Sequence, residues 1–340
     1  MLHPELSVVV PVYEEALVLA ELHRRLVAAL DGCTGRWEIV YVDDGSHDAS
    51  PLVLGGVVAN DARVRVLRFS RNFGHQAAVT AGLEHAMGEA VITIDGDLQD
   101  PPELIPELVA RWRDGFQVVS AVRTVREGES PVRLVLIRAF YRLLGALASL
   151  PLTPDSGDYR LLDRRVVDVL CRLPERHRYV RGLAQWVGFR QCTVAYRRQP
   201  RFAGQTKYPY RKLVGLALDG ITSFSTAPLR FATYMGFALS LASLALILFA
   251  LWAKLILGTG PQGWASVVLA VGLLSGAQLL ALGIIGLYVG RILDEVRGRP
   301  LYVLADDDPN AARRPPQSMA PSTSSAPPVS APPATRPGGR

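Results

Sequence analysis

Two carboxylates one residue apart, Asp95 and Asp97, directly follow the apolar, β-branched run 91–94. Such runs are typical of strands that are covered on both faces. Open α/β sheets bind ligands at the carboxyl ends of their strands, and Gly96 is expected to let a ligand approach the backbone. Carboxylates suit Mg²⁺ or Mn²⁺, which usually bind one or two of them together with substrate phosphates. The pair predicts a site for a divalent cation and a diphosphate; the alternative is a simple polar turn before a helix.

Strand-like and helix-like segments alternate through the first half of the chain, and these must position the two carboxylates. Strands are predicted over residues 6–11, 37–42, 64–69 and 90–94, and helices over 14–30 and 76–87. This βαβ rhythm predicts an α/β fold with a mostly parallel sheet and helices on both faces. It is a layout that often binds nucleotides, but the fold alone proves no chemistry.

Two uncharged segments, 231–253 and 264–290, predict transmembrane helices. Each exceeds the ~20 residues needed to cross a hydrocarbon core of ~30 Å. Lysines and arginines precede and follow the pair, so the positive-inside rule places both termini in the cytoplasm. No cleavable leader is expected at the start of the chain, so the N-terminal part is expected to stay in the cytoplasm. These features predict a multi-pass protein of the inner, cytoplasmic membrane.

The composition narrows the classes of protein and partner. With 340 residues, 49% of them hydrophobic, the chain can bury a sizeable core. Its three cysteines lack zinc-type spacing, which fits a reducing compartment. The net charge of +6 comes from dispersed arginines without an aromatic-basic motif. A membrane surface and phosphate substrates therefore explain the charge better than nucleic acid does.

Five short motifs occur in order, and together they carry a resemblance. They are residues 8–15 (Val-Val-Val-Pro-Val-Tyr-Glu-Glu), 43–46 (Asp-Asp-Gly-Ser), 71–75 (Arg-Asn-Phe-Gly-His), 95–103 (Asp-Gly-Asp-Leu-Gln-Asp-Pro-Pro-Glu) and 155–160 (Asp-Ser-Gly-Asp-Tyr-Arg). The chain resembles the family-2 glycosyltransferases of GT-A fold, specifically the polyprenyl-phosphate glycosyltransferases, over about residues 5–300. The resemblance implies an enzyme that moves a sugar from a nucleoside-diphosphate sugar to polyprenyl phosphate, such as undecaprenyl phosphate.

The resemblance also implies which loops bind the donor. Pro11, Tyr13 and Glu14 follow the first predicted strand, and Asp43 and Asp44 follow the second, so both loops are expected to line one pocket for the base and ribose. A turn and helix cap at residues 43–46 is the alternative, and both can hold together.

For the metal, the resemblance implies that Asp95 and Asp97 flank a Mg²⁺ or Mn²⁺ ion. Asp97 is expected to be the direct ligand, and hence part of the catalytic apparatus, with Gln99 as a further ligand. The sequence does not choose between the two cations.

Asp158 matches the family's catalytic carboxylate near the acceptor. A hydroxyl acceptor would need a general base. A phosphate monoester is already largely ionised at neutral pH, since its second pKa lies near ~6. Asp158 is therefore expected to orient the nucleophile or the sugar more than to remove a proton. The alternative is a turn carboxylate paired with Arg160.

Basic residues near the membrane are the candidates for binding phosphate. The resemblance assigns the lipid phosphate to the region of Arg123, Arg126, Arg133 and Arg138, with Arg201 nearby, and places Lys207 in a loop that closes over the donor diphosphate. Arginine suits bidentate phosphate contact, although each of these residues can equally be a solvated or headgroup-contacting charge. Segments 134–147 and 210–229 are predicted to be helices in the membrane interface, or else ordinary amphipathic core helices.

The sequence predicts five regions. They are a cytoplasmic GT-A catalytic domain over 1–208, an interfacial helix over 209–230, a transmembrane hairpin over 231–290, a cytoplasmic juxtamembrane segment over 291–305, and a disordered tail rich in Pro, Ser and Ala over 306–340. His75 is expected to shape the pocket rather than do chemistry. The resemblance also allows a homo-oligomer, a tetramer in related bacterial members.

The predicted reaction is inverting transfer of a single sugar, with UDP-glucose favoured as donor and GDP-mannose next. UDP-galactose and an amino-arabinose donor follow, since the motifs bind what these donors share. A non-catalytic scaffold that binds the lipid carrier is the alternative of another class, and the intact Asp95, Asp97 and Asp158 disfavour it. A processive polysaccharide synthase is disfavoured because two helices make a poor pore and the Gln-x-x-Arg-Trp motif is missing from the sequence.

Overall fold

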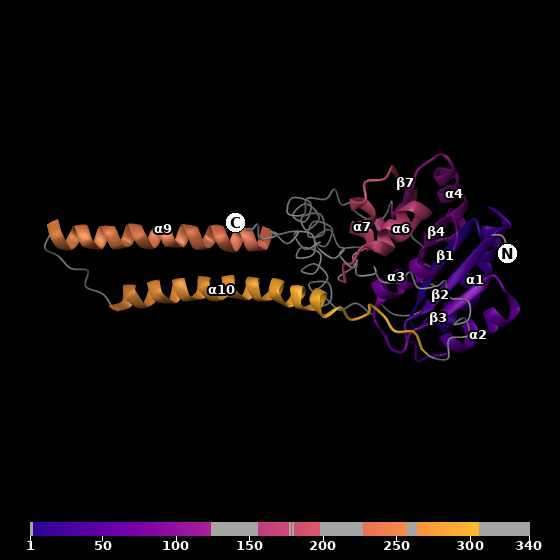
Figure 1. Cartoon of the computed structure of the whole chain (residues 1–340), viewed down its shortest axis with the longest axis horizontal. Coiled ribbons are helices and arrows are strands. Elements are labelled where there is room, and N and C mark those ends of the chain that lie inside the picture. The colour runs from indigo at the N-terminus through magenta and orange to yellow at the C-terminus, as the bar shows by residue number, and fades with distance from the viewer. Residues whose placement is uncertain are drawn as a thin grey trace, which may run out of the picture.

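A computed structural model describes residues 3–123, 156–176, 178, 180–197, 227–256 and 264–305. These residues form an α/β domain from which two long helices project in one direction (Figure 1). The interfacial segment predicted over 134–147 and the tail over 306–340 lie outside the described residues, as does the segment over 210–229 except for its last residues, which begin the first long helix.

The domain is built on one sheet. Its strands are β1 (Leu6–Val12), β2 (Trp37–Asp43), β3 (Val64–Arg68), β4 (Ala90–Thr93), β5 (Val118–Arg123), β6 (Ser156–Asp163) and β7 (Gln191–Tyr196), in the order β3-β2-β1-β4-β6-β5-β7. Among these strands only β6 pairs antiparallel with its neighbours, β4 and β5. The mostly parallel sheet is confirmed, and the β6 insertion is a feature that the alternation of elements did not predict.

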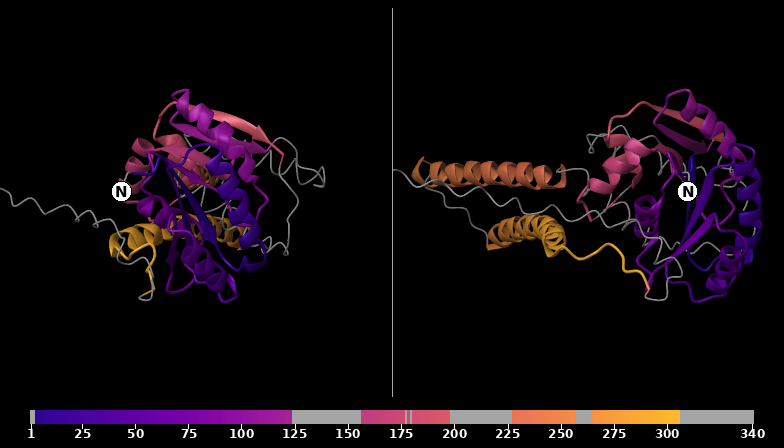
Figure 2. Two further views of the ribbon diagram at one scale, coloured as in Figure 1. Left: turned by 90° about the vertical axis from the view of Figure 1, so that its right-hand side faces the viewer. Right: turned by 45° about the vertical axis from the view of Figure 1, so that its right-hand side comes forward.

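Helices cover both faces of the sheet (Figure 2). Alternate side chains of β1 face opposite ways: Val8 and Val10 pack in the core with α1, whereas Val9 packs with α3. One face carries α1 (Ala16–Asp31), α2 (Ser50–Asn60) and α4 (Ile105–Arg113), which the short turn η1 (Pro102–Leu104) precedes. The other face carries α3 (His75–His85), α6 (Arg164–Arg172) and α7 (Val180–Trp186).

The two projecting helices, α9 (Ala227–Ile256) and α10 (Trp264–Arg297), lie side by side (Figure 1). Within them Leu229–Phe249 and Ala270–Arg297 are long and apolar enough to cross a membrane. Core helices of soluble proteins are mostly buried, but these segments are at most 6% buried. Their exposed apolar surface fits membrane spans. Helix α10 runs past residue 290, where the uncharged span ends at Arg291, and it continues to Arg297.

Close packing of α3 on the sheet depends on a residue without a side chain. A Cβ atom at Gly82 would lie 2.1 Å from Cγ1 of Val9. At Gly55 in α2, by contrast, a Cβ would meet no atom within 4 Å. An alanine at Gly82 would therefore test packing against Val9, whereas an alanine at Gly55 would change only the helix propensity of α2.

We predict that Gly82→Ala destabilises the domain by about 1–3 kcal/mol, because α3 or β1 must shift to relieve the overlap. Gly55→Ala is the matched control, expected to be neutral or to stabilise α2 by up to ~1 kcal/mol. Thermal unfolding of the purified proteins in one detergent measures both. Equal midpoints for Gly82→Ala and the wild type would contradict the described packing.

Candidate active site

The candidate site lies at the edge of the sheet where the parallel strands end. Asp95 follows β4 by two residues, and His75 is the first residue of α3. Because β6 runs against β4, with Thr93 opposite Arg160, the start of β6 brings Asp158 to the same edge. The Thr93 hydroxyl donates a hydrogen bond to the carbonyl oxygen of Asp158, which ties the two strands together at this point.

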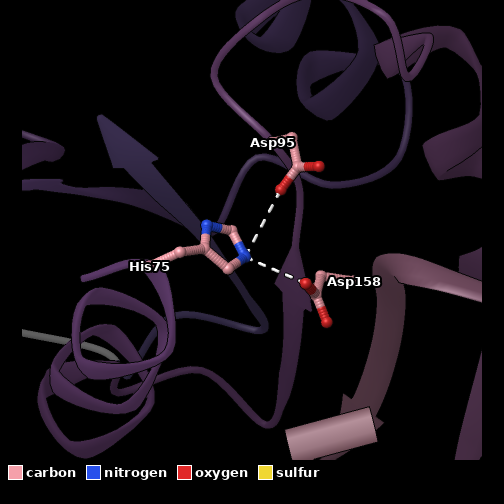
Figure 3. Close-up of side chains that lie close together, drawn as sticks. All are labelled: His75, Asp95 and Asp158. Atoms are coloured by element: carbon pink, nitrogen blue, oxygen red, sulfur yellow. Dashed lines mark hydrogen bonds and ion pairs between the residues drawn. The ribbon is translucent and has the colours of Figure 1, made fainter. Parts of the chain in front are cut away.

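Asp158 is held by two cationic side chains. Arg181, from α7, donates from Nε to one carboxylate oxygen and from a terminal nitrogen to the other, each at 2.7 Å. His75 Nε2 lies 2.9 Å from Oδ2 of the same group (Figure 3). Burial by itself would raise the pKa of Asp158, but the Arg181 charge and the hydrogen bonds from Arg181 and His75 hold it well below its usual range. Asp158 is therefore a fixed anion.

His75 lies between two carboxylates. Its Nε2 is 3.7 Å from Oδ1 of Asp95, an ion-pair distance longer than a hydrogen bond (Figure 3). Burial lowers the pKa of His75, yet the hydrogen bond with Asp158 and the charges of both carboxylates raise it to about 9. Burial raises the pKa of Asp95 to about 6, against the lowering effect of the His75 charge. At neutral pH the imidazole is thus a cation that links the two acids.

The carboxylates differ in how well they fit the role of ligand to a divalent cation. His75, Asp95 and Asp158 each offer a ligand atom within 4.8 Å of the others. Asp158, however, already has both oxygens bound by Arg181, whereas Oδ1 of Asp95 is buried and accepts no hydrogen bond from the residues described. The His75 imidazolium, 3.7 Å from this oxygen, offsets only part of the cost of burying it without a hydrogen-bond donor. Asp95 fits a metal ligand better than Asp158 does.

The loop after β4 is rigidly built. Oδ1 of Asp97 accepts a hydrogen bond from the Gln99 amide at 3.1 Å, so these two predicted ligands lie in one tight turn. Leu98 between them is buried and adopts a φ of 57°, a conformation that costs energy for a residue with a side chain. A Cβ at Gly96 would lie 2.9 Å from the Pro11 carbonyl oxygen. The glycine is therefore required by the chain's own packing, and the expected approach of a ligand at Gly96 remains a prediction.

Arg123 contacts the loop after β4 through Tyr196 and Asp100. Its Nε donates to the Tyr196 hydroxyl at 3.1 Å, and its NH2 nitrogen lies 3.7 Å from Oδ1 of Asp100. The Tyr196 hydroxyl in turn donates to Asp100, and the Tyr159 hydroxyl donates to the Pro101 carbonyl at 3.0 Å. Arg123 thus fixes the carboxylate loop, and its predicted contact with lipid phosphate remains a prediction.

The predicted nucleotide loops meet beside the carboxylate cluster. Asp44 accepts hydrogen bonds from the amides of Phe73 at 2.7 Å and Gly74 at 2.9 Å. Asp43 accepts from the Ser46 amide at 2.9 Å, so the predicted turn exists, but α2 begins only at Ser50 and neither aspartate caps it. Burial raises the pKa of Asp44, while the two amides oppose that shift.

Several hydrogen bonds join the first loop to the second, among them one from the Asp44 amide to the Val12 carbonyl at 2.9 Å and one from the Ala16 amide to Asp48 at 3.2 Å. The Ser46 hydroxyl accepts a hydrogen bond from the Glu14 amide at 3.0 Å, and Glu14 adopts a positive φ of 54°. Pro11 is buried within β1, while Tyr13 and Glu14 are half-buried beyond its end. The structure thus brings these predicted residues to one edge, and their role with a nucleotide remains a prediction.

Other predicted residues lie outside the described part of the chain. They are Arg126, Arg133, Arg138, Arg201 and Lys207. Conversely, two residues in the cluster were not predicted to have this importance. Arg181 was not singled out, because no local pattern marks it, and His75 was expected only to shape the pocket. The partner of Asp158 is Arg181 rather than Arg160, whose guanidinium donates to the Gly157 carbonyl at 2.8 Å.

Known proteins resemble this chain over most of its length. Residues 7–170 match the family described as Glycosyl transferase family 2. Uncharacterized glycosyltransferase YkcC of Bacillus subtilis (strain 168) is 46% identical over 302 residues, which cover 89% of this chain and 94% of that protein. SfII prophage-derived bactoprenol glucosyl transferase of Shigella flexneri is 38% identical over 303 residues, which cover 88% and 97%.

Among solved structures, mannosyltransferase PcManGT from Pyrobaculum calidifontis, in complex with GDP-Man and Mn²⁺, is 18% identical. That match has a TM-score of 0.42 and covers 82% of this chain and 87% of the other. The GT-A-like α/β fold and the resemblance to polyprenyl-phosphate glycosyltransferases, both expected from the motifs, are confirmed. The chain is a glycosyltransferase and belongs to glycosyl transferase family 2.

Proposed function

We propose that this protein transfers a single glucose from UDP-glucose to a polyprenyl phosphate, undecaprenyl phosphate in bacteria, with inversion at the anomeric carbon. The observation that carries the proposal is the match to a bactoprenol glucosyl transferase over 97% of that protein's length, which takes in the two long apolar helices as well as the catalytic domain. The ordered carboxylates at the sheet edge support a working enzyme over a non-catalytic scaffold.

For the donor, Asp95 and Asp97, with Gln99, would hold Mg²⁺ or Mn²⁺. The buried Oδ1 of Asp95 supports this assignment, because it accepts no hydrogen bond from the described residues and its ion-pair partner His75 lies 3.7 Å away. When bound, such a cation offsets the charge that develops on a departing nucleoside diphosphate. The loops at Pro11, Tyr13 and Glu14 and at Asp43 and Asp44 would hold the base and ribose.

For the acceptor, Asp158 would act as a positioning anion. Its pKa is held well below the usual range, so it is a poor proton acceptor at neutral pH. A phosphate monoester needs no base, because it is largely ionised when its second pKa is ~6. The phosphate oxygen forms the new bond to the anomeric carbon as the bond to the diphosphate breaks, and the electron pair leaves with the diphosphate.

The same contacts argue for a single displacement. A retaining transfer by double displacement would need a carboxylate nucleophile to form a covalent glycosyl intermediate. Both oxygens of Asp158 are already bound by Arg181. The Arg181 side chain is 30% exposed but that of Asp158 only 6%, so freeing Asp158 from Arg181 would leave a buried carboxylate short of a partner. Asp158 is therefore a poor nucleophile, and direct attack by the acceptor phosphate gives inversion.

For the lipid, the exposed apolar surfaces of α9 and α10 would anchor the domain at the cytoplasmic membrane, with both termini on the cytoplasmic side. The arginines at 126, 133, 138 and 201 would bind the acceptor phosphate, and Lys207 the donor diphosphate. A homo-oligomer is compatible with this arrangement and remains a proposal.

We predict that labelled glucose passes from UDP-glucose to undecaprenyl phosphate when the purified full-length protein is incubated in detergent with Mg²⁺ or Mn²⁺. Radiolabel in the lipid fraction measures it, with GDP-mannose tested in parallel. Asp97→Ala is expected to lose transfer, whereas Asp114→Ala, at a carboxylate 62% exposed in α4's cap, is expected to keep it. Transfer from GDP-mannose alone would show that GDP-mannose, and not UDP-glucose, is the donor. Binding of a donor without transfer to any lipid would favour the non-catalytic scaffold.

We predict that Arg181→Ala lowers kcat about 100-fold, because a misplaced carboxylate at the reacting centre costs roughly that much. The KM for the donor is expected to change little, since the Arg181 hydrogen bonds that the structure describes go to Asp158. Arg181→Lys recovers only part of the rate, because lysine cannot reproduce the bidentate contact. Arg165→Ala is the control, at an exposed arginine paired with Asp163. Equal rates for Arg181→Ala and the wild type would refute the positioning role.

A further inference from the structure

The chain returns to the catalytic domain after its second long helix. Helix α10 ends at Arg297, Gly298 follows with a φ of 64°, and residues 299–305 run back along the α/β domain (Figure 2). Leu304 forms an antiparallel bridge with Phe69, directly after β3. The Ser70 amide donates to the Val303 carbonyl at 2.9 Å, and the Ala305 amide donates to the Arg68 carbonyl at 2.8 Å. This segment, residues 298–305, is called the strap below.

Tyr302 is the strap's main side-chain contact. Its ring stacks on Phe69, with centroids 4.9 Å apart and planes 15° apart. Its hydroxyl donates to Glu84 of α3 at 2.6 Å. Stacked aromatic pairs contribute about 0.5–1.5 kcal/mol beyond the area they bury. Tyr302 and Leu304 also pack against the buried cluster that joins β2, β3 and α3, so the strap completes a part of the core.

A short series of contacts leads from Tyr302 to the active site. Phe69, 2% exposed, meets Phe73 edge-to-face with ring centroids 5.7 Å apart. The amides of Phe73 and Gly74 are the two donors to Asp44. The next residue, His75, binds Asp158. One loop, residues 69–75, therefore carries the strap contact at one end and the site contacts at the other.

The strap is also tied to the membrane helix. Glu295, in the last turns of α10, accepts a hydrogen bond from the Arg176 amide at 2.9 Å, after α6 on the catalytic domain. Only four residues separate the end of α10 from Tyr302. The position of the membrane helix and the packing at Phe69 are therefore set together.

We propose that the strap is a positioning element and Tyr302 a positioning residue. By packing on Phe69 they hold loop 69–75 in the shape that gives Asp44 its amide donors and Asp158 its imidazole partner. The membrane anchor and the donor site are coupled through this contact. The expected effect on donor binding rests on the proposed function. The effect of the strap on the shape of loop 69–75 does not depend on it.

Hydrogen exchange of the full-length protein in detergent tests the loop directly. Tyr302→Ala is expected to speed exchange at the Phe73 and Gly74 amides about tenfold or more, because local opening then costs less. The core of α1 serves as an internal reference and is expected to stay unchanged. Tyr302→Phe keeps the stacked ring and is expected to restore slow exchange. Val303→Ala is the matched control, since that side chain is 46% exposed and its backbone bond to Ser70 remains.

Kinetics give the second readout. Tyr302→Ala is expected to raise the donor KM about tenfold, a change of ~1.4 kcal/mol, with a smaller change in kcat, and Tyr302→Phe to restore it. Tyr302→Leu, which keeps an apolar side chain, is measured in the same way if Tyr302→Ala does not fold. Unchanged exchange at Phe73 and Gly74, or an equal increase throughout α1, would overturn the proposal. Neither exchange result depends on glycosyl transfer, so failure of the proposed function is recognised separately.

Discussion

A buried carboxylate held between two cations is the interaction on which the site depends. Asp158 is 4% exposed. It is bound by His75, which precedes it in the sequence, and by Arg181, which follows it. An unpaired charge at such a depth would be strongly destabilising, so its partners must arrive together when the chain folds. This requirement joins β6, α3 and α7 at one edge of the sheet. Asp95 then lies next to His75, and the loop after β4, which is proposed to bind the metal, is placed by the same cluster.

The rest of the molecule holds that edge in place from three directions. The loop after β4 is held by the contacts among Asp100, Arg123 and Tyr196. Asp44 fixes the loop before α3 through its backbone amides. The strap packs on the far end of that loop, where Tyr302 meets Phe69. Few of these contacts touch the reacting atoms, but each limits where the carboxylates can lie.

Much of this arrangement could be predicted where the signal is local. Apolar β-branched runs located β1 to β4 to within one residue, whereas β5, β6 and β7 were not predicted, and uncharged segments located the two long helices. The carboxylates at 95 and 97 could be placed because strand ends carry ligands in α/β sheets. The contact between Arg181 and Asp158 could not be predicted, since the two residues lie 23 positions apart and no spacing rule links them.

The strap escaped prediction for the same reason. Residues 291–305 were expected to form a simple juxtamembrane segment, because short polar stretches beside a membrane helix carry no sign of a distant partner. In the structure Tyr302 meets Glu84, which is 218 positions away. Likewise, nothing in the strand's own sequence marks the antiparallel direction of β6. Local pattern thus predicted the elements, and tertiary contacts decided which side chains meet.

The anomeric configuration of the lipid product tests the account most directly. Nuclear magnetic resonance of the glycosyl phosphate, made from a donor of known α configuration, distinguishes direct displacement from a double displacement. With Asp158 bound on both oxygens, the account predicts a β-linked product from α-linked UDP-glucose. An α-linked product would exclude a single in-line displacement, and it would contradict the mechanism in which Asp158 only positions the reactants.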